Sequence, residues 1–222
     1  MGIISLEKTN HLFWLGRYTE RVFTTVKTFL VCYDKMIDGD ETLYRGICSA
    51  LAIPDVYGSR EAFLQKYLFD ENNADSVYTN LTRAFDNAVV LRDEISSQTL
   101  SYIQLALTTM EKAKDSATPL MDLESVLDDL FAFWGSADDN VLSEDCRCIM
   151  KCGKYIERLD LYIALGYSRE AIVHEFQKLD YRLHSTDYPI NEAACSRFKR
   201  AILRDEDLHP DVEVLNHIFE VD

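Results

Sequence analysis

The sequence predicts an all-α protein, a single multi-helix bundle over residues 1–222 with two equivalent helices at its centre. Three observations support this prediction. Apolar side chains recur at the three- and four-residue spacing of helices along most of the chain. No segment alternates apolar and polar residues over the length of a strand. The motif G-[RK]-Y-x-E-R occurs at residues 16–21 and again, 137 positions later, at residues 153–158.

The apolar face around the motif repeats together with it. The shared apolar positions are Leu12, Leu15, Thr19, Val22 and Val26 in the first copy and Ile149, Cys152, Ile156, Leu159 and Ile163 in the second. Side chains four positions apart share a helix face, so each motif glycine lies one turn before the motif glutamate. A glycine there lets another helix approach closely. We expect the two helices to cross at their glycines, pairing Glu20 with Arg158 and Glu157 with Arg21.

This charged centre has two interpretations. Buried charges must be paired and hydrogen-bonded, so reciprocal Glu–Arg pairs would serve as a structural lock that sets helix register and crossing. Alternatively, the charges converge on a polar ligand and form a site. Glu20 and Glu157 are then the acid–base candidates, and Arg17, Arg21 and Arg158 would hold an anionic substrate. The lock is favoured because structural ion-pair networks imitate sites.

Ten helices are predicted from apolar faces bounded by capping residues and breakers. They cover residues 9–34, 40–53, 59–69, 76–94, 97–110, 119–135, 143–166, 168–184 and 191–204, with a last short helix after Pro210. Serine or aspartate begins most of them, at Asp40, Ser59, Asp75 or Ser76, Ser97, Ser143 and Ser168. Breakers separate them, at residues 38–40, Pro54, residues 70–73, Pro119, Gly135, Gly166 and Pro189.

Composition limits the classes of function. With 47% apolar residues, the chain can bury a sizeable core. The net charge of −15 argues against binding to nucleic acid or to an anionic membrane surface. No apolar run has membrane-spanning length and no signal peptide is present, so we expect a cytoplasmic protein. The six cysteines lack the spacing of a zinc site and are interpreted as buried thiols in a reducing compartment.

No nucleotide-binding or catalytic motif accompanies the charged centre. The sequence has no glycine-rich phosphate loop, no nucleophile elbow and no metalloprotease motif, which argues against a self-sufficient nucleotide-using enzyme. Three acid–histidine pairs occur at i, i+4 spacing: Glu170/His174, Asp180/His184 and Glu213/His217. They are better explained as helix-surface pairs than as metal ligands, so no metal site is predicted. His11 lies near Gly16 and is a further ligand-binding candidate.

With both motifs considered, the chain resembles the bacterial alpha-E family, helical proteins named for a recurring Glu-Arg pair. Four segments carry the resemblance in the family's order: residues 11–21, residues 70–77, Asn87-Ala88 with Arg92-Asp93, and residues 153–160. The departures from the family's pattern are His11 for Asn, Phe23 and Thr24 for Glu and Asn, Ala74 for Pro, and Lys154 for Arg. The resemblance adds Arg92, Asp93 and Lys154 to the ligand-binding candidates.

The resemblance also implies a functional context. Alpha-E proteins look like partners of ATP-grasp ligases, and sometimes of transglutaminase-like proteins. This implies a role in ATP-dependent amide or peptide bond formation, or in peptide modification. The ligase would bind ATP and magnesium, so no cofactor is expected on this chain.

Three functional hypotheses follow. The favoured one is an accessory or substrate-binding protein that works with such a ligase. Under this hypothesis the chain is expected to be a non-catalytic or partner-dependent subunit. The second is an enzyme that uses the Glu–Arg centre for acid–base chemistry on an anionic substrate. The third is a purely structural or interaction protein. The surroundings of Glu20 and Glu157 separate them: sealed pairs indicate a lock, and a carboxylate at a cavity indicates a site.

Overall fold

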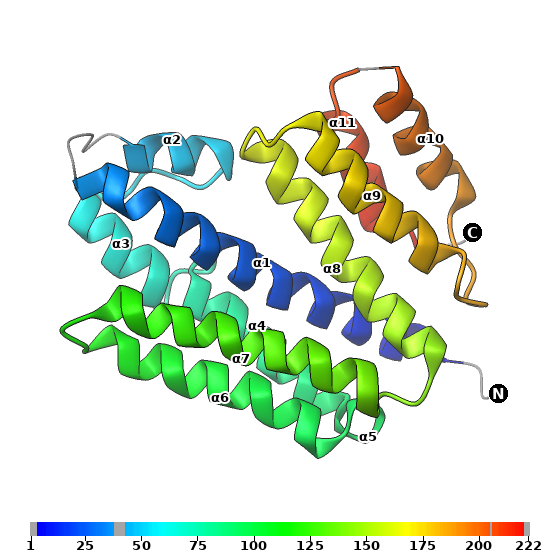
Figure 1. The fold of residues 1–222 in the computed structure, drawn as a ribbon, viewed down its shortest axis with the longest axis horizontal. Helices are drawn as coiled ribbons and strands as arrows, with labels where there is room; N and C mark the ends of the chain where they lie inside the picture. Colours follow the sequence, from blue (N-terminus) through cyan, green and yellow to red (C-terminus); the bar gives the residue numbers. More distant parts are fainter. Residues whose placement is uncertain (1–3, 38–42, 205, 220–222) are drawn as a thin grey trace.

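A computed structural model describes residues 4–37, 43–204 and 206–219 of the chain. The described residues form helices joined by turns and contain no strand, which confirms the all-α prediction (Figure 1). The helices are α1 (Leu6–Ile37), α2 (Leu43–Ala50), α3 (Arg60–Phe69), α4 (Val77–Val90), α5 (Arg92–Ile95), α6 (Ser97–Lys114), α7 (Pro119–Asn140), α8 (Glu144–Ala164), α9 (Arg169–Leu183), α10 (Glu192–Leu203) and α11 (His209–Val212), followed by the 3₁₀ helix η1 (Glu213–His217).

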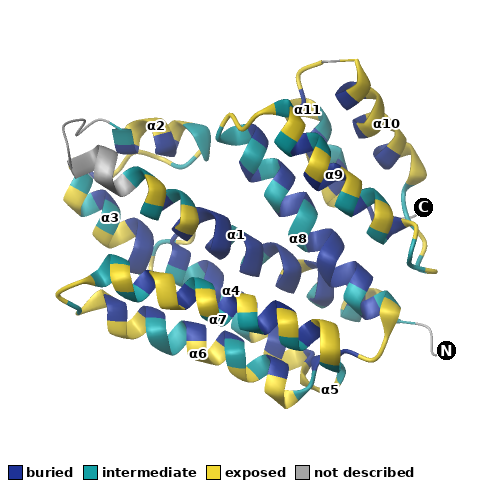
Figure 2. Ribbon diagram, viewed as in Figure 1, coloured by how far each residue is buried: buried dark blue, intermediate teal, exposed yellow. Residues whose placement is uncertain are grey.

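Helices α1 and α8, which carry the two copies of the motif, form the centre as predicted. They cross each other and make the most extensive helix–helix packing in the described part of the chain. Helices α4 and α7 pack against α1, and α6 packs against both of them, while α9, α11 and η1 pack against α8 (Figure 1). Buried residues follow α1 and α8 through the middle of the molecule (Figure 2). The two motif helices are therefore the elements on which the others assemble.

The two central helices touch backbone to backbone at the motif glycines. A Cβ atom built on Gly16 would lie 2.0 Å from the carbonyl oxygen of Met150, and one on Gly153 would lie 2.1 Å from that of Phe13. Met150 is the residue 137 positions after Phe13, so the contact is reciprocal. This confirms the predicted crossing and explains why glycine, a poor helix former, occupies both positions.

The capping residues mostly follow the sequence prediction. The side chains that accept a hydrogen bond from the third residue after them are Ser59, Ser76, Ser96, Ser143, Ser168 and Asn191. Helix α6 begins at Ser97 as predicted, and the preceding Ser96 caps it and adopts a positive φ of 72° where the chain turns. Gly166, with a φ of 70°, follows α8 where the sequence predicts its end.

Three predicted boundaries are wrong. Helix α7 continues through Gly135 to Asn140, because an exposed glycine costs a helix only about 1 kcal/mol and buried side chains lie on both sides of it. The helix predicted to run through residue 94 breaks at Leu91 into α4 and α5. Helix α2 ends at Ala50 rather than near residue 53. The predicted cap Asp40 and the turn at residues 38–40 lie outside the described residues.

Two general features bear on function. No helix among the described residues combines the length and apolarity needed to cross a membrane. The six cysteines are free thiols, and five of them are buried: Cys48, Cys146, Cys148, Cys152 and Cys195.

Candidate functional site

The first half of the charged centre is the ion pair between Glu20 and Arg158. The Glu20 side chain is completely buried, and Arg158 donates from Nε to Oε1 at 2.7 Å and from Nη2 to Oε2 at 2.8 Å. The Thr24 hydroxyl donates to Oε1 at 2.6 Å. Arg158 also donates to Glu175 at 3.2 Å, and Lys178 donates to the other oxygen of Glu175 at 2.7 Å. Glu20 thus has no access to solvent, and this half has the geometry of a lock.

The charge of Arg158 depends on this arrangement. Burial works against a charged guanidinium group, but the negative charges of Glu20 and Glu175 outweigh it and raise the pKa of Arg158. The predicted pair of Glu20 with Arg158 is confirmed, with bidentate geometry.

The second half of the centre is Glu157, which two arginines hold. Arg17 donates from Nε to Oε2 at 2.6 Å, and Arg21 donates from Nε to Oε1 at 2.5 Å. Burial favours the neutral carboxyl group, but the two positive charges outweigh it and lower the pKa of Glu157. The predicted pair with Arg21 is confirmed. Arg17 is an additional partner, and it also contacts Asp160, at 3.4 Å, and Asn216.

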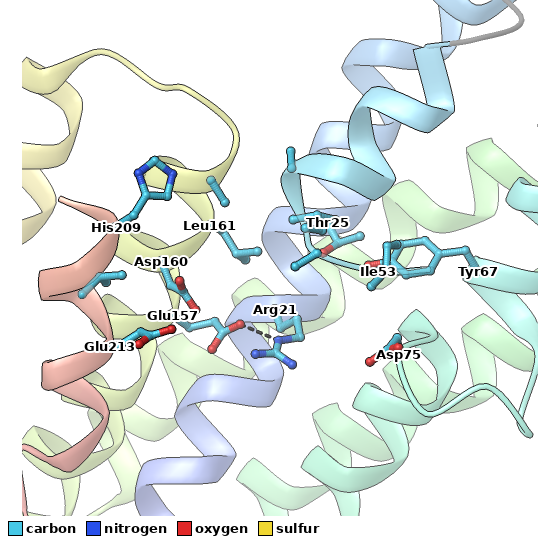
Figure 3. Close-up of a pocket in the computed structure, with 15 residues that line it drawn as sticks. Arg21, Thr25, Ile53, Tyr67, Asp75, Glu157, Asp160, Leu161, His209 and Glu213 are labelled. Carbon is cyan, nitrogen blue, oxygen red and sulfur yellow. Dashed lines mark hydrogen bonds and ion pairs between the residues drawn. The ribbon is translucent and has the colours of Figure 1, made fainter. Parts of the chain in front are cut away.

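This second half differs from the first because it opens to a cavity of about 330 Å³. Side chains from α1, α2, α3, the turn before α4, α8 and the α11–η1 segment meet there, with Arg21 reaching toward Glu157 between α1 and α8 (Figure 3). The polar residues lining the cavity are Arg21, Thr25, Tyr67, Asp75, Glu157, Asp160, His209 and Glu213. The side chain of Arg21 is 34% exposed, and within the described residues only its Nε forms a hydrogen bond. Its two terminal nitrogens are thus available to a ligand.

Asp160 is a cavity carboxylate whose pKa the surroundings raise. Burial raises its pKa, and the negative charge of Glu157 acts in the same direction. Arg17 and Arg21 oppose this shift without cancelling it, while Glu213 adds a further small increase. The carboxylate nevertheless remains 40% exposed, so a ligand can reach it.

Lys154 shows how far the two motif copies differ. It occupies the position of Arg17 in the second copy, yet within the described residues it forms no ion pair, and its Nζ lies 4.2 Å from the ring centre of Trp134. Burial lowers the pKa of Lys154 to about 8, and the charge of Glu20 opposes this only in part. The second carboxylate of the centre is therefore held by two basic side chains, and the first by one.

Replacing Lys154 with methionine is expected to stabilise the protein near pH 7 by about 1–3 kcal/mol, because it removes a partly buried ammonium group that has no ion pair within the described residues. The pKa is lower in the folded state, about 8 against 10.5, so the folded state binds fewer protons between these values. The destabilisation of the folded state by the charge of Lys154 is therefore complete below about pH 8 and disappears as the pH rises toward 10.5.

Urea denaturation of wild type and Lys154→Met at several pH values measures this difference. The stabilisation should shrink between pH 8 and 10.5. The exposed Lys112 of α6 provides the matched control, since Lys112→Met should give a small difference that does not change with pH. A pH-independent effect of Lys154→Met would contradict the assigned pKa.

The other candidates from the sequence lie apart from the lining of this cavity. His11 is half-buried, and its Nδ1 lies 2.7 Å from the Asn87 side-chain oxygen. Arg92 and Asp93 are on α5 with exposed side chains, 66% and 90% respectively. Arg158 and Glu20 belong to the sealed half. Among the candidates, the structure therefore brings only Arg21 and Glu157 to the cavity wall, with Arg17 directly behind them.

Several residues of the cavity carry no signal that the sequence reasoning used. Asp160 could have been found, because it lies three positions after Glu157 and so shares its helix face. From the sequence, Asp75 is expected only as a helix cap and Glu213 only as part of a surface pair. The described residues contain no group of three His, Cys, Asp or Glu side chains arranged to hold a metal ion.

Comparison with known proteins identifies one family. The family model Alpha-E, described as a predicted alpha-helical domain with a conserved ER motif, matches residues 8–187. The matched range includes both Glu-Arg pairs and ends before α10. The cavity residues His209 and Glu213 thus lie beyond it. No curated protein and no solved structure matches the chain.

Proposed function

The chain belongs to the Alpha-E family, and from this premise we propose that it is the substrate-binding partner of an ATP-grasp-type ligase in ATP-dependent amide or peptide bond formation. One observation carries the proposal. The two motif copies form similar ion pairs, but in the described part of the chain the Glu157–Arg21 pair stands in the wall of a cavity with exposed polar groups, whereas the Glu20 side chain is sealed. A purely structural role for the motif explains the sealed pair and leaves this cavity without a purpose.

The size of the cavity fits a small polar substrate. Its volume of about 330 Å³ is at the lower end of the range for small-molecule sites, about 300–1,000 Å³. Its wall holds charged groups that can orient such a molecule. In this proposal the ligase binds ATP and magnesium, and this chain positions the molecule to be joined.

The geometry favours binding over acid–base catalysis by the motif glutamates. A general acid or base must exchange a proton with the substrate near the working pH. Glu20 is sealed from solvent. Glu157 has zero exposure as well, and both of its oxygens accept hydrogen bonds from arginines that lower its pKa. Neither group is placed to exchange protons, whereas Arg21 and Asp160 are accessible to a ligand.

Blocking the cavity is expected to abolish the contribution of this chain to the ligase reaction. Ala164 lines the cavity at the end of α8 without taking part in the ion pairs, so Ala164→Phe fills space and leaves the charges intact. We expect the variant to copurify with the ligase as wild type does. ADP release by the complex should then fall at least about tenfold, because the substrate no longer fits.

Ala132→Phe is the matched control, since Ala132 is also a partly exposed helical alanine but lies on α7. It should leave both association and ADP release unchanged. The proposal fails if the ligase does not associate with the wild-type chain, or if Ala164→Phe supports full activity.

A further inference from the structure

The charges around the cavity indicate the class of substrate. Resting on the proposed function, we infer that the cavity binds the amino component of the ligation, a small molecule or peptide end that carries a protonated primary amine. This differs from the anionic substrate that the arginines of the motif suggest from sequence alone. The difference arises because the structure surrounds those arginines with carboxylates.

The balance of charge at the cavity is negative. The carboxylates that line it are Asp75, Glu157, Asp160 and Glu213. Arg21 is the only lysine or arginine among the lining residues of this cavity. Arg17, behind the wall, shares Glu157 and Asp160 with Arg21. The two guanidinium groups therefore balance two of the carboxylates, and two remain without compensation.

The uncompensated carboxylates are Asp75 and Glu213. Both are exposed, and neither forms an ion pair within the described part of the chain. The remaining basic group of the lining is His209, whose Nδ1 lies 2.7 Å from Asp207 rather than from a cavity carboxylate. A cation that enters the cavity thus gains attraction, while a carboxylate or phosphate meets net repulsion.

Asp160 and Glu213 form the wall best suited to an ammonium group. They come from α8 and η1, lie on the same side of the cavity in Figure 3, and are close enough for the charge of Glu213 to raise the pKa of Asp160. Two neighbouring carboxylates repel each other, and an ammonium group between them removes this repulsion. Three N–H donors allow it to bond both.

A further group points to a ligand that also carries an oxygen acceptor. Arg21 lines the cavity, and its terminal nitrogens make no hydrogen bond within the described part of the chain. An amine with a nearby carbonyl or carboxylate oxygen, as in an amino acid or a peptide end, can bond both the carboxylates of Asp160 and Glu213 and the donors of Arg21.

Three small probes separate the contributions of the amine and the carboxylate. Glycinamide carries the amine alone, glycine carries both, and N-acetylglycine carries the carboxylate alone. We would titrate each into the isotope-labelled full chain and follow amide NMR shifts. Glycinamide and glycine should bind with shifts at cavity residues, and N-acetylglycine should not bind.

Two charge-removing variants test the proposed wall. Asp160→Asn and Glu213→Gln should each weaken glycinamide binding by about tenfold, the size expected for a hydrogen bond to a charged group. Glu124→Gln is the matched control, because Glu124 is an exposed carboxylate on α7. Glu213 is also exposed, so its replacement is compatible with folding, and circular dichroism verifies this for each variant.

The outcomes distinguish this inference from the function on which it rests. Binding of N-acetylglycine in place of the amines overturns the inference about substrate class, as does failure of all three probes. Unchanged glycinamide binding by both charge variants overturns it too. Each of these results leaves the ligase experiment intact, whereas full ligase activity with Ala164→Phe rejects the proposed function itself.

Discussion

Replacing Gly16 with alanine is expected to cost more than about 3 kcal/mol of the free energy of unfolding, or to prevent folding. The new Cβ atom would lie 2.0 Å from the carbonyl oxygen of Met150, and 3.0 Å from the backbone nitrogen of Lys154. Because these are backbone atoms of a central helix, no side-chain rotation can relieve the clash. The two helices must separate, which also moves both ion pairs of the centre.

Urea denaturation followed by circular dichroism measures this effect, and Gly135→Ala is its control. Gly135 is also helical, but a Cβ atom there meets nothing within 4 Å, so alanine should stabilise α7 by up to about 1 kcal/mol. The change in the free energy of unfolding is therefore expected to have opposite signs at these two helical glycines, because only Gly16 of the two is packed against another backbone. Equal stability of wild type and Gly16→Ala would contradict the close crossing.

Replacing Glu20 with glutamine is expected to lower the free energy of unfolding by about 3–5 kcal/mol, although the side chain keeps its shape. The change removes one charge of a buried pair, so Arg158 keeps only Glu175 as a charged partner. In either orientation the new amide would also point hydrogens toward a nitrogen of Arg158, because both oxygens of Glu20 accept from Arg158.

The same variant separates the lock from the site. Glycinamide binding should be unchanged in Glu20→Gln under conditions where it is folded, because Glu20 does not line the cavity. Asp93→Asn is the control for stability. Asp93 also faces an arginine, at 3.8 Å, but its side chain is 90% exposed, so the change should be within about 0.5 kcal/mol. Wild-type stability of Glu20→Gln would show that its ion pair does not lock the crossing.

Local sequence patterns account for most of the fold. Helix starts such as Ser76 and Ser143 could be predicted, because the cap bonds a backbone group three residues away. The boundaries that failed depend on packing instead. Gly135 continues α7 because buried side chains on both sides of it offset the modest cost of the glycine.

The repeated motif by itself determined the centre of this protein. A glycine one turn before a glutamate, present twice with the same apolar face, is enough to predict that α1 and α8 cross at Gly16 and Gly153. The partners of Glu20 and Glu157 follow from that crossing, because an exchange of partners is the arrangement that pairs both buried charges.

Only the tertiary structure decided that one copy is a lock and the other opens to a site. The motif copies are nearly equivalent in sequence, but their neighbours are not. Helix α9 brings Glu175 against Arg158 and closes the first half, whereas Asp75, His209 and Glu213 surround the second without filling it. These residues come from distant parts of the chain, and no spacing relates them. Burial and charge balance are sums over such neighbours, so the site emerges only when the helices pack.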